Sequence, residues 1–98
     1  MSSQALMWIA TLSEKQRLTL RLIADFLREN GGRCFNYRRL RAFWDRRRMW
    51  RSLEWHTAER VVRLFAEDGL LERRGRGRRV EFCLSDRLEK MLGELGWL

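Results

Sequence analysis

The sequence lacks any apolar run that approaches the roughly 18 residues needed for a transmembrane helix. Residues 1–12 also lack the basic start and the uninterrupted apolar centre of a secretory signal. We therefore expect an intracellular, cytoplasmic protein that makes no membrane contact.

Residue types that carry chemistry are scarce. The chain has only two cysteines and one histidine, which are widely separated and too few for a convincing zinc site. No glycine-rich phosphate loop follows an expected strand, no nucleophile-elbow motif occurs, and His56 has no obvious nucleophile beside it. We expect a protein that is not an enzyme and that needs neither a metal nor another cofactor.

Positive charge is abundant, and it is concentrated in the middle of the chain. The net charge is +8, and residues 33–79 hold 15 arginines against six acids, a balance of +9. The rest of the chain has a balance of −1. A concentrated basic region favours phosphate-bearing partners through counterion release. Arginine outnumbers lysine 19 to 2, which suits bidentate contacts with phosphate and guanine, although a GC-rich genome or a thermophilic host would explain the same bias.

The 98 residues fit one domain, residues 1–98, with 45% apolar residues for a packed core. A helix is expected over residues 13–30, with Ser13 and Gln16 as a capping box and a stop at the Gly31-Gly32 pair. A brief strand is expected over residues 33–35. Asn36 then caps a second helix, which either continues through residues 46–51 or gives way there to an extended turn.

A third helix is expected over residues 57–68, preceded by Leu53 as an apolar anchor and by Ser52 as its cap. Alternation over residues 80–84 and the GRGR run predict a hairpin over residues 70–84. Ser85 or Asp86 caps a last helix that ends near Gly96. The fold class is therefore mainly α with a small antiparallel β-hairpin (α+β).

This order of elements resembles the winged helix-turn-helix superfamily, including MarR-like transcription regulators. The resemblance covers residues 13–84, and residues 1–12 and 85–98 are then extra terminal helical segments for packing or dimerisation. Two features depart from the pattern: the connection before the third helix is long and bulky, and that helix starts with the acidic and aromatic pair Glu54 and Trp55. The apolar positions that carry the resemblance are Leu53, Ala58, Val62, Phe65 and Gly69-Leu70-Leu71.

The resemblance implies that the third helix enters the major groove of double-stranded DNA. Its solvent-facing residues are then the candidate base readers; the alternative is a solvated helix face in which Glu59 and Arg63 form an i, i+4 pair. These candidates are His56, Thr57, Glu59, Arg60 and Arg63.

The hairpin, which corresponds to the wing of the superfamily, carries a dense group of arginines. Their mutual repulsion is relieved by a polyanion, so we expect them to contact phosphates or a minor groove, the alternative being solvated charge. The hairpin group is Arg73, Arg74, Arg76, Arg78 and Arg79.

A second group of arginines, on the second helix and the connection after it, is expected to contact the DNA backbone. This group is Arg38, Arg39, Arg41, Arg47, Arg48 and Arg51, with Arg46 beside it.

Two aromatic residues and two cysteines leave alternatives open. Trp50 and Trp55 either stack on unpaired bases, which favours single strands or RNA, or belong to the core or an interface.

In a winged helix the first strand pairs with the returning wing strand, which brings Cys34 and Cys83 together on one face. They are then either a disulfide or two reduced thiols.

The apolar chain ends suggest a homodimer that presents two DNA-binding surfaces; the alternative is that the ends pack on each other within one chain. The sequence thus predicts a nucleoid-associated, double-stranded DNA-binding protein, sequence-specific or general, with a role in transcription regulation. The alternatives are a winged-helix module that docks another protein in a transcription or replication assembly, and RNA binding.

Overall fold

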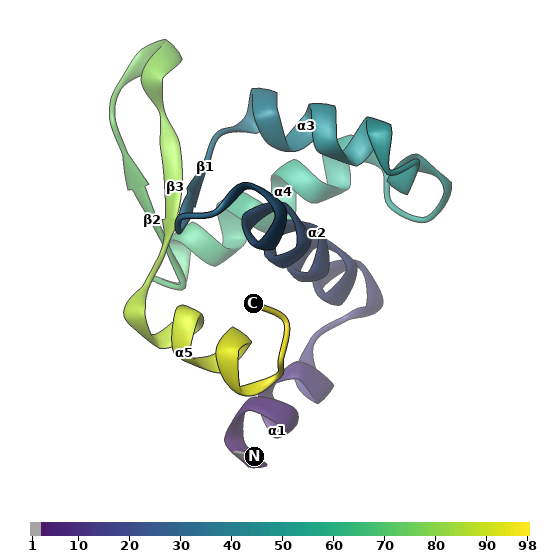
Figure 1. Cartoon of the computed structure of the whole chain (residues 1–98), viewed down its shortest axis with the longest axis vertical. Helices are drawn as coiled ribbons and strands as arrows, with labels where there is room; N and C mark the ends of the chain where they lie inside the picture. The colour runs from purple at the N-terminus through teal and green to yellow at the C-terminus, as the bar shows by residue number, and fades with distance from the viewer. Residues whose placement is uncertain (1–2) are drawn as a thin grey trace.

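The computed structural model describes residues 3–98, and its longest helix, α2 (Glu14–Asn30), lies at the centre of the fold (Figure 1). The expected capping box is present. The Ser13 hydroxyl accepts a hydrogen bond from the backbone N–H of Gln16, and the Gln16 side chain accepts one from the backbone N–H of Ser13. The helix ends at Gly31, whose φ is 79°. Its buried side comprises Thr19, Leu20, Leu22, Ile23, Ala24, Phe26 and Leu27.

The second expected helix is α3 (Tyr37–Arg46), and Asn36 caps it by accepting a hydrogen bond from the backbone N–H of Arg39. The helix does not continue through the arginine-rich run that follows. The chain instead passes through Arg48, whose φ of 55° is left-handed, into a short 3₁₀ helix (Met49–Arg51). A left-handed residue cannot continue a right-handed helix, so α3 and the next helix are separate.

The third expected helix, α4 (Trp55–Glu67), begins two residues earlier than the sequence indicates. Ser52 does not cap it; Glu54 occupies the cap position and makes no side-chain capping bond there. The start is fixed instead by burial of Leu53 and Trp55, which are 1% and 7% exposed. Leu64, an apolar residue of this helix, is 37% exposed and does not belong to the core.

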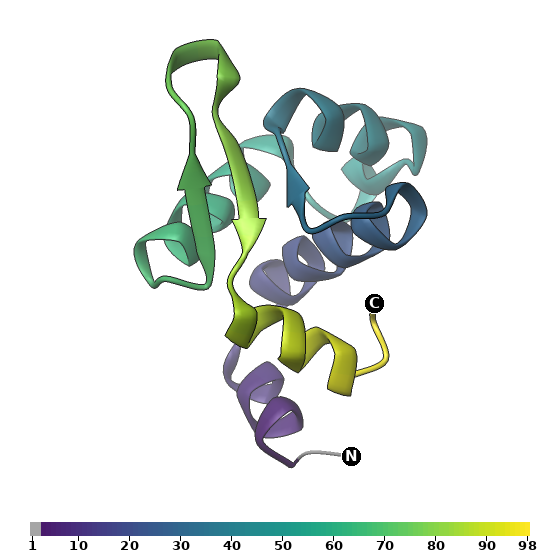
Figure 2. The same cartoon turned by 60° about the vertical axis from the view of Figure 1, so that its left-hand side comes forward.

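Three short strands form an antiparallel sheet in the order β1 (Cys34–Phe35), β3 (Glu81–Leu84), β2 (Leu71–Arg74). Cys34 pairs with Cys83, and Phe35 pairs with Phe82. Strands β2 and β3 form the expected hairpin, and a short 3₁₀ helix (Gly77–Arg79) lies at its tip. The hairpin projects from the body of the molecule beside the start of α3 (Figure 2).

The chain ends form two further helices, α1 (Ser3–Thr11) and α5 (Asp86–Glu94), the second capped by the Ser85 hydroxyl. They lie together at the end of the molecule opposite the hairpin tip (Figures 1 and 2). Ala5 and Leu92 are fully buried there, so both chain ends pack on the core of the same chain. Residues 1–2 of the expected N-terminal segment lie outside the described residues.

One apolar cluster joins all five helices to the inner face of the sheet. Phe35, Phe82 and Leu84 contribute to it from the sheet, as the strand alternation predicts. The mainly helical α+β fold class is confirmed. Over residues 3–98, none of the helices is both long and apolar enough to cross a membrane.

Candidate nucleic-acid interface

Most arginines of the basic middle region have no acidic partner among the described residues. Four of the 15 arginines in residues 33–79 form ion pairs, and eleven do not. The paired ones are Arg33, Arg46, Arg47 and Arg74. Unpaired guanidinium groups keep their full charge available for an anionic partner. The unpaired ones are Arg38, Arg39, Arg41, Arg48, Arg51, Arg60, Arg63, Arg73, Arg76, Arg78 and Arg79.

The hairpin carries five of the candidate arginines, all exposed. Only Arg74 is paired: it contacts Glu72 at 2.9 Å and lies opposite Glu81 in the strand register. The tip is a defined turn rather than a loose loop. Gly75 has a φ of 86°, and a Cβ there would overlap the carbonyl oxygen of Arg79. Glycine at position 75 is therefore required by geometry, which fixes where the tip arginines lie.

The exposed side of α4 presents His56, Arg60 and Arg63 to solvent, while Thr57 and Glu59 are partly buried. The i, i+4 pair between Glu59 and Arg63 is not formed among the described residues. Glu59 instead lies 3.4 Å from the Nδ1 atom of His56. Arg60 and Arg63 therefore remain the two cations of this surface without an acidic partner.

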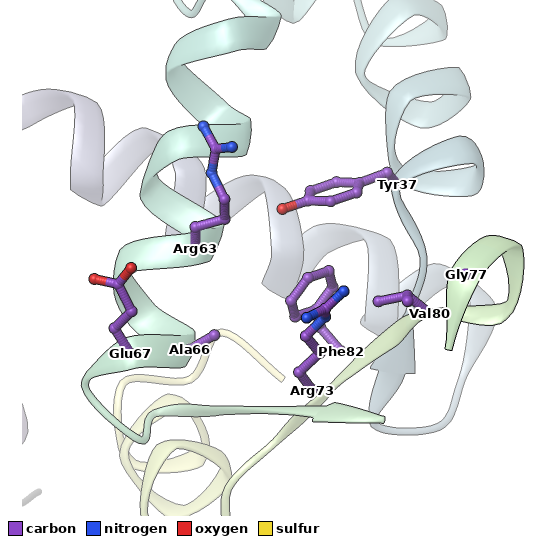
Figure 3. A pocket seen from close by; sticks show the side chains of 8 residues that line it. All are labelled: Tyr37, Arg63, Ala66, Glu67, Arg73, Gly77, Val80 and Phe82. Atoms are coloured by element: carbon purple, nitrogen blue, oxygen red, sulfur yellow. The ribbon is translucent and has the colours of Figure 1, made fainter. Parts of the chain in front are cut away.

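A groove of about 450 Å³ separates α4 from the hairpin (Figure 3). Arg63 projects from the α4 wall, and Arg73 rises from β2 beside the ring of Phe82. Tyr37 points from the start of α3 toward α4, and its ring centroid lies 5.0 Å from that of Phe82. The groove thus has an aromatic floor between two unpaired arginines. Its lining residues are Tyr37, Arg63, Ala66, Glu67, Arg73, Gly77, Val80 and Phe82.

The environment of Tyr37 keeps its hydroxyl neutral. Burial raises the pKa of Tyr37 above its ordinary value of 10.0, while the positive charges of Arg63 and Arg73 act to lower it. The hydroxyl lies 3.5 Å from the backbone carbonyl oxygen of Glu59, toward which it can donate. At neutral pH the groove lining therefore carries two arginines, the carboxylate of Glu67 and an uncharged phenol. The net positive charge and the aromatic floor suit an anionic ligand with a flat or apolar part.

The arginines of α3 divide into two sets. The guanidinium of Arg41 lies 5.9 Å from the ring centre of Trp55. Arg38 and Arg41 together line a shallow hollow beside Trp44. Arg39 instead lies 5.5 Å from the ring of Phe26 on α2. The set directed toward α2 also includes Arg46 and Arg47, which contact Glu29 at 3.0 Å and 3.7 Å. Arg38 and Arg41 are therefore better placed than Arg39, Arg46 and Arg47 to share a partner with α4.

The structure separates the two tryptophans that the sequence left ambiguous. Trp55 is 7% exposed and contacts Tyr37 and Trp44, so it belongs to the core. Trp50, in the connection between α3 and α4, is 50% exposed. Only Trp50 is accessible to a stacking ligand.

Cys34 and Cys83 are joined by a disulfide across β1 and β3. Glu81 lies next to them, and the potential ligand atoms of these three residues are within 4.8 Å of one another. Metal ions bind thiolates, and both sulfurs are consumed by the disulfide. This cluster therefore does not form a metal site in the oxidised chain.

The sequence pattern did not identify the groove floor. Tyr37, Val80 and Phe82 come from segments more than 40 residues apart and meet only because β3 lies between β1 and β2. Neither protein-family models, curated proteins nor solved structures show a match to this chain. The positions of the unpaired arginines, the groove and Trp50 are therefore the features from which function is inferred.

Proposed function

We propose that this chain is a winged-helix protein that binds double-stranded DNA and acts in transcription regulation. The order α2, β1, α3, α4, β2, β3 and the strand order β1-β3-β2 support the winged-helix assignment. The observation that carries the DNA assignment is the set of unpaired arginines on both walls of the groove between α4 and the hairpin, including Arg63 and Arg73.

In this proposal α4 lies in the major groove, whose width of about 12 Å admits a helix. Arg60 and Arg63 then face base edges, where guanidinium groups form bidentate contacts with guanine. The hairpin reaches the neighbouring backbone, and Arg76 and Arg78 contact phosphates or enter the minor groove. Arg38 and Arg41 contact the backbone beside the start of α4.

The hairpin contact is tested by the double substitution Arg76→Ala with Arg78→Ala. The matched control is Arg17→Ala with Arg28→Ala, which removes the same charge from exposed positions on α2, outside both the groove and the hollow between α1 and α5. We expect the hairpin variant to lose about tenfold or more in duplex affinity and the control to change less than threefold. Equal losses in both variants would mean that only net charge matters, which contradicts a hairpin site.

A homodimer formed through the terminal helices is part of the proposal. Leu6 and Met7 on α1 are 47% and 68% exposed, although the other side of α1 packs on the core. Met7 also borders a hollow between α1 and α5 that carries both Lys90 and Glu94. Charges of both signs beside an apolar strip are self-complementary under a twofold axis, so a second copy fits this surface. Sedimentation of wild type and of Met7→Glu tests it: the substitution should shift a dimer to a monomer.

Docking of another protein is less well supported by the structure than DNA binding. The feature that favours that alternative is the acidic and aromatic start of α4, but Trp55 is buried there rather than exposed. A partner protein would leave the hairpin arginines without a role. The docking alternative would be favoured if wild type bound no duplex DNA and the Arg76→Ala, Arg78→Ala variant still bound a partner protein with unchanged affinity.

A further inference from the structure

Trp50 is a large apolar side chain held outside the core. It is 50% exposed, whereas Trp55 is 7% exposed and Trp44 donates its indole N–H to the carbonyl oxygen of Leu53 at 2.7 Å. Trp8 and Trp97 are packed against the core. Of the five tryptophans, all within residues 3–98, Trp50 alone has half its surface open to solvent. Hydrophobic burial therefore does not account for its position.

The turn that carries Trp50 is fixed by its neighbours. The backbone N–H groups of Ser52 and Leu53 both donate to the carbonyl oxygen of Met49 at 2.9 Å. Lys15 on α2 donates to the carbonyl oxygen of Ser52 at 2.7 Å. Met49 packs against the core, so the residue before Trp50 anchors the turn while the indole itself projects outward. Because the backbone of this turn is held in place, little backbone conformational entropy is lost when a ligand stacks on the exposed indole.

Two unpaired arginines belong to the same turn as Trp50, and one of them contacts its ring. The Arg51 guanidinium lies 5.5 Å from the centre of the Trp50 ring, and within residues 3–98 neither Arg48 nor Arg51 has an acidic partner. Arg48 adopts a left-handed conformation, with φ of 55°, which is unusual for a residue other than glycine. A nucleotide offers a flat base for the indole and a phosphate for a guanidinium, so it matches both parts of this surface.

The Trp50 turn and the hairpin lie at opposite ends of α4. The turn precedes the start of α4 at Trp55, and β2 follows its end at Glu67. The 13 residues of α4 span about 20 Å at 1.5 Å per residue. A nucleic acid that contacts both the hairpin and the Trp50 turn therefore extends over the full length of α4.

We propose that Trp50, with Arg48 and Arg51, forms a stacking site for one unpaired nucleobase. This inference rests on the proposed function and makes it more specific: the preferred partner is a DNA duplex that meets a single-stranded segment, with the duplex against the hairpin and α4 and the first unpaired bases at the Trp50 turn. A fully paired duplex leaves this site empty because its bases are stacked on each other.

The experiment compares a blunt duplex with the same duplex carrying a single-stranded extension of six nucleotides, with 2-aminopurine at the first unpaired positions. Wild type should bind the extended DNA roughly tenfold more tightly than the blunt duplex and should quench the 2-aminopurine emission. Trp50→Ala should bind both DNAs equally and should not quench. Trp50→Phe, which keeps an aromatic face, should retain most of the preference.

The outcomes separate this inference from the proposed function. Equal binding of both DNAs by wild type, or a preference and quenching that persist in Trp50→Ala, overturns the stacking site while leaving duplex binding intact. Absence of any duplex binding overturns the proposed function instead. An unchanged thermal unfolding midpoint of Trp50→Ala, expected for an exposed side chain, shows that the comparison is made on folded protein.

Discussion

Cys34 on β1 lies directly opposite Cys83 on β3, and a disulfide joins them. The two residues are 49 positions apart, so the bond closes a loop that contains α3, α4 and β2. A cross-link of this separation restricts the unfolded chain strongly, because a long loop has more conformational entropy to lose. The bond also attaches the two-residue strand β1 to the base of the hairpin.

Reduction of this disulfide should lower the free energy of unfolding by about 2–4 kcal/mol. Denaturant titration with and without a dithiol reductant measures the difference. The control is the double variant Cys34→Ser with Cys83→Ser, whose unfolding should not respond to the reductant. Identical unfolding of oxidised and reduced wild type would show that the cross-link does not stabilise the fold.

Substitution of Gly75 by alanine should distort the hairpin tip. The new Cβ would meet the carbonyl oxygen of Arg79 in a backbone with φ of 86°. Gly77 is a matched control because its φ of 57° is also positive but nothing lies within 4 Å of its Cβ position. Gly77→Ala should cost only about 1–2 kcal/mol of local backbone strain. We expect Gly75→Ala to reduce the affinity for duplex DNA clearly more than Gly77→Ala does. Titrations of both variants with one duplex provide the comparison, and equal affinities would contradict a fixed tip.

Tyr37 is the only tyrosine of the chain, so the absorbance of tyrosinate reports the groove alone. Its midpoint should lie above 10.0 in the folded protein because burial raises the pKa of Tyr37. Since the folded pKa exceeds the unfolded one, the protonated hydroxyl contributes to stability below pH about 10, and this contribution is lost as the pH rises through the folded value.

The same titration tests the charge of the groove. Arg63 lowers the pKa of Tyr37, so Arg63→Ala should move the tyrosinate midpoint upward. Arg60→Ala, one turn away on α4 and outside the groove lining, serves as the control and should move it less. A midpoint that falls in Arg63→Ala would mean that Arg63 does not act on Tyr37 through its charge.

Local sequence signals were sufficient for much of the fold. Capping residues marked the starts of three helices, at Ser13, Asn36 and Ser85. Capping depends on residues close in sequence, which is why pattern alone identifies these helix starts. The proximity of Cys34 and Cys83 instead followed from the resemblance, which implies that the first strand pairs with the returning strand, combined with the two-residue period of a strand.

Features set by tertiary packing could not be predicted in the same way. The start of α4 has no capping side chain, and the burial of Leu53 and Trp55 explains it instead. The sequence left both Trp50 and Trp55 ambiguous, but Trp50 lies outside the core and Trp55 lies inside it. The groove floor joins residues from α3 and β3. The need for glycine at position 75 arises from a contact with Arg79 across the turn.

The most direct measurement is the affinity for a random duplex across a salt series, followed by fluorescence anisotropy, with single-stranded DNA and RNA as comparators. If about six phosphates are neutralised by the arginines of α3, α4 and the hairpin, the logarithm of the affinity should fall with the logarithm of the salt concentration with a slope near −5. If the protein bound RNA more tightly than the DNA duplex, its partner would be RNA instead of DNA. A flat salt response, with no binding of any duplex, would contradict the central claim.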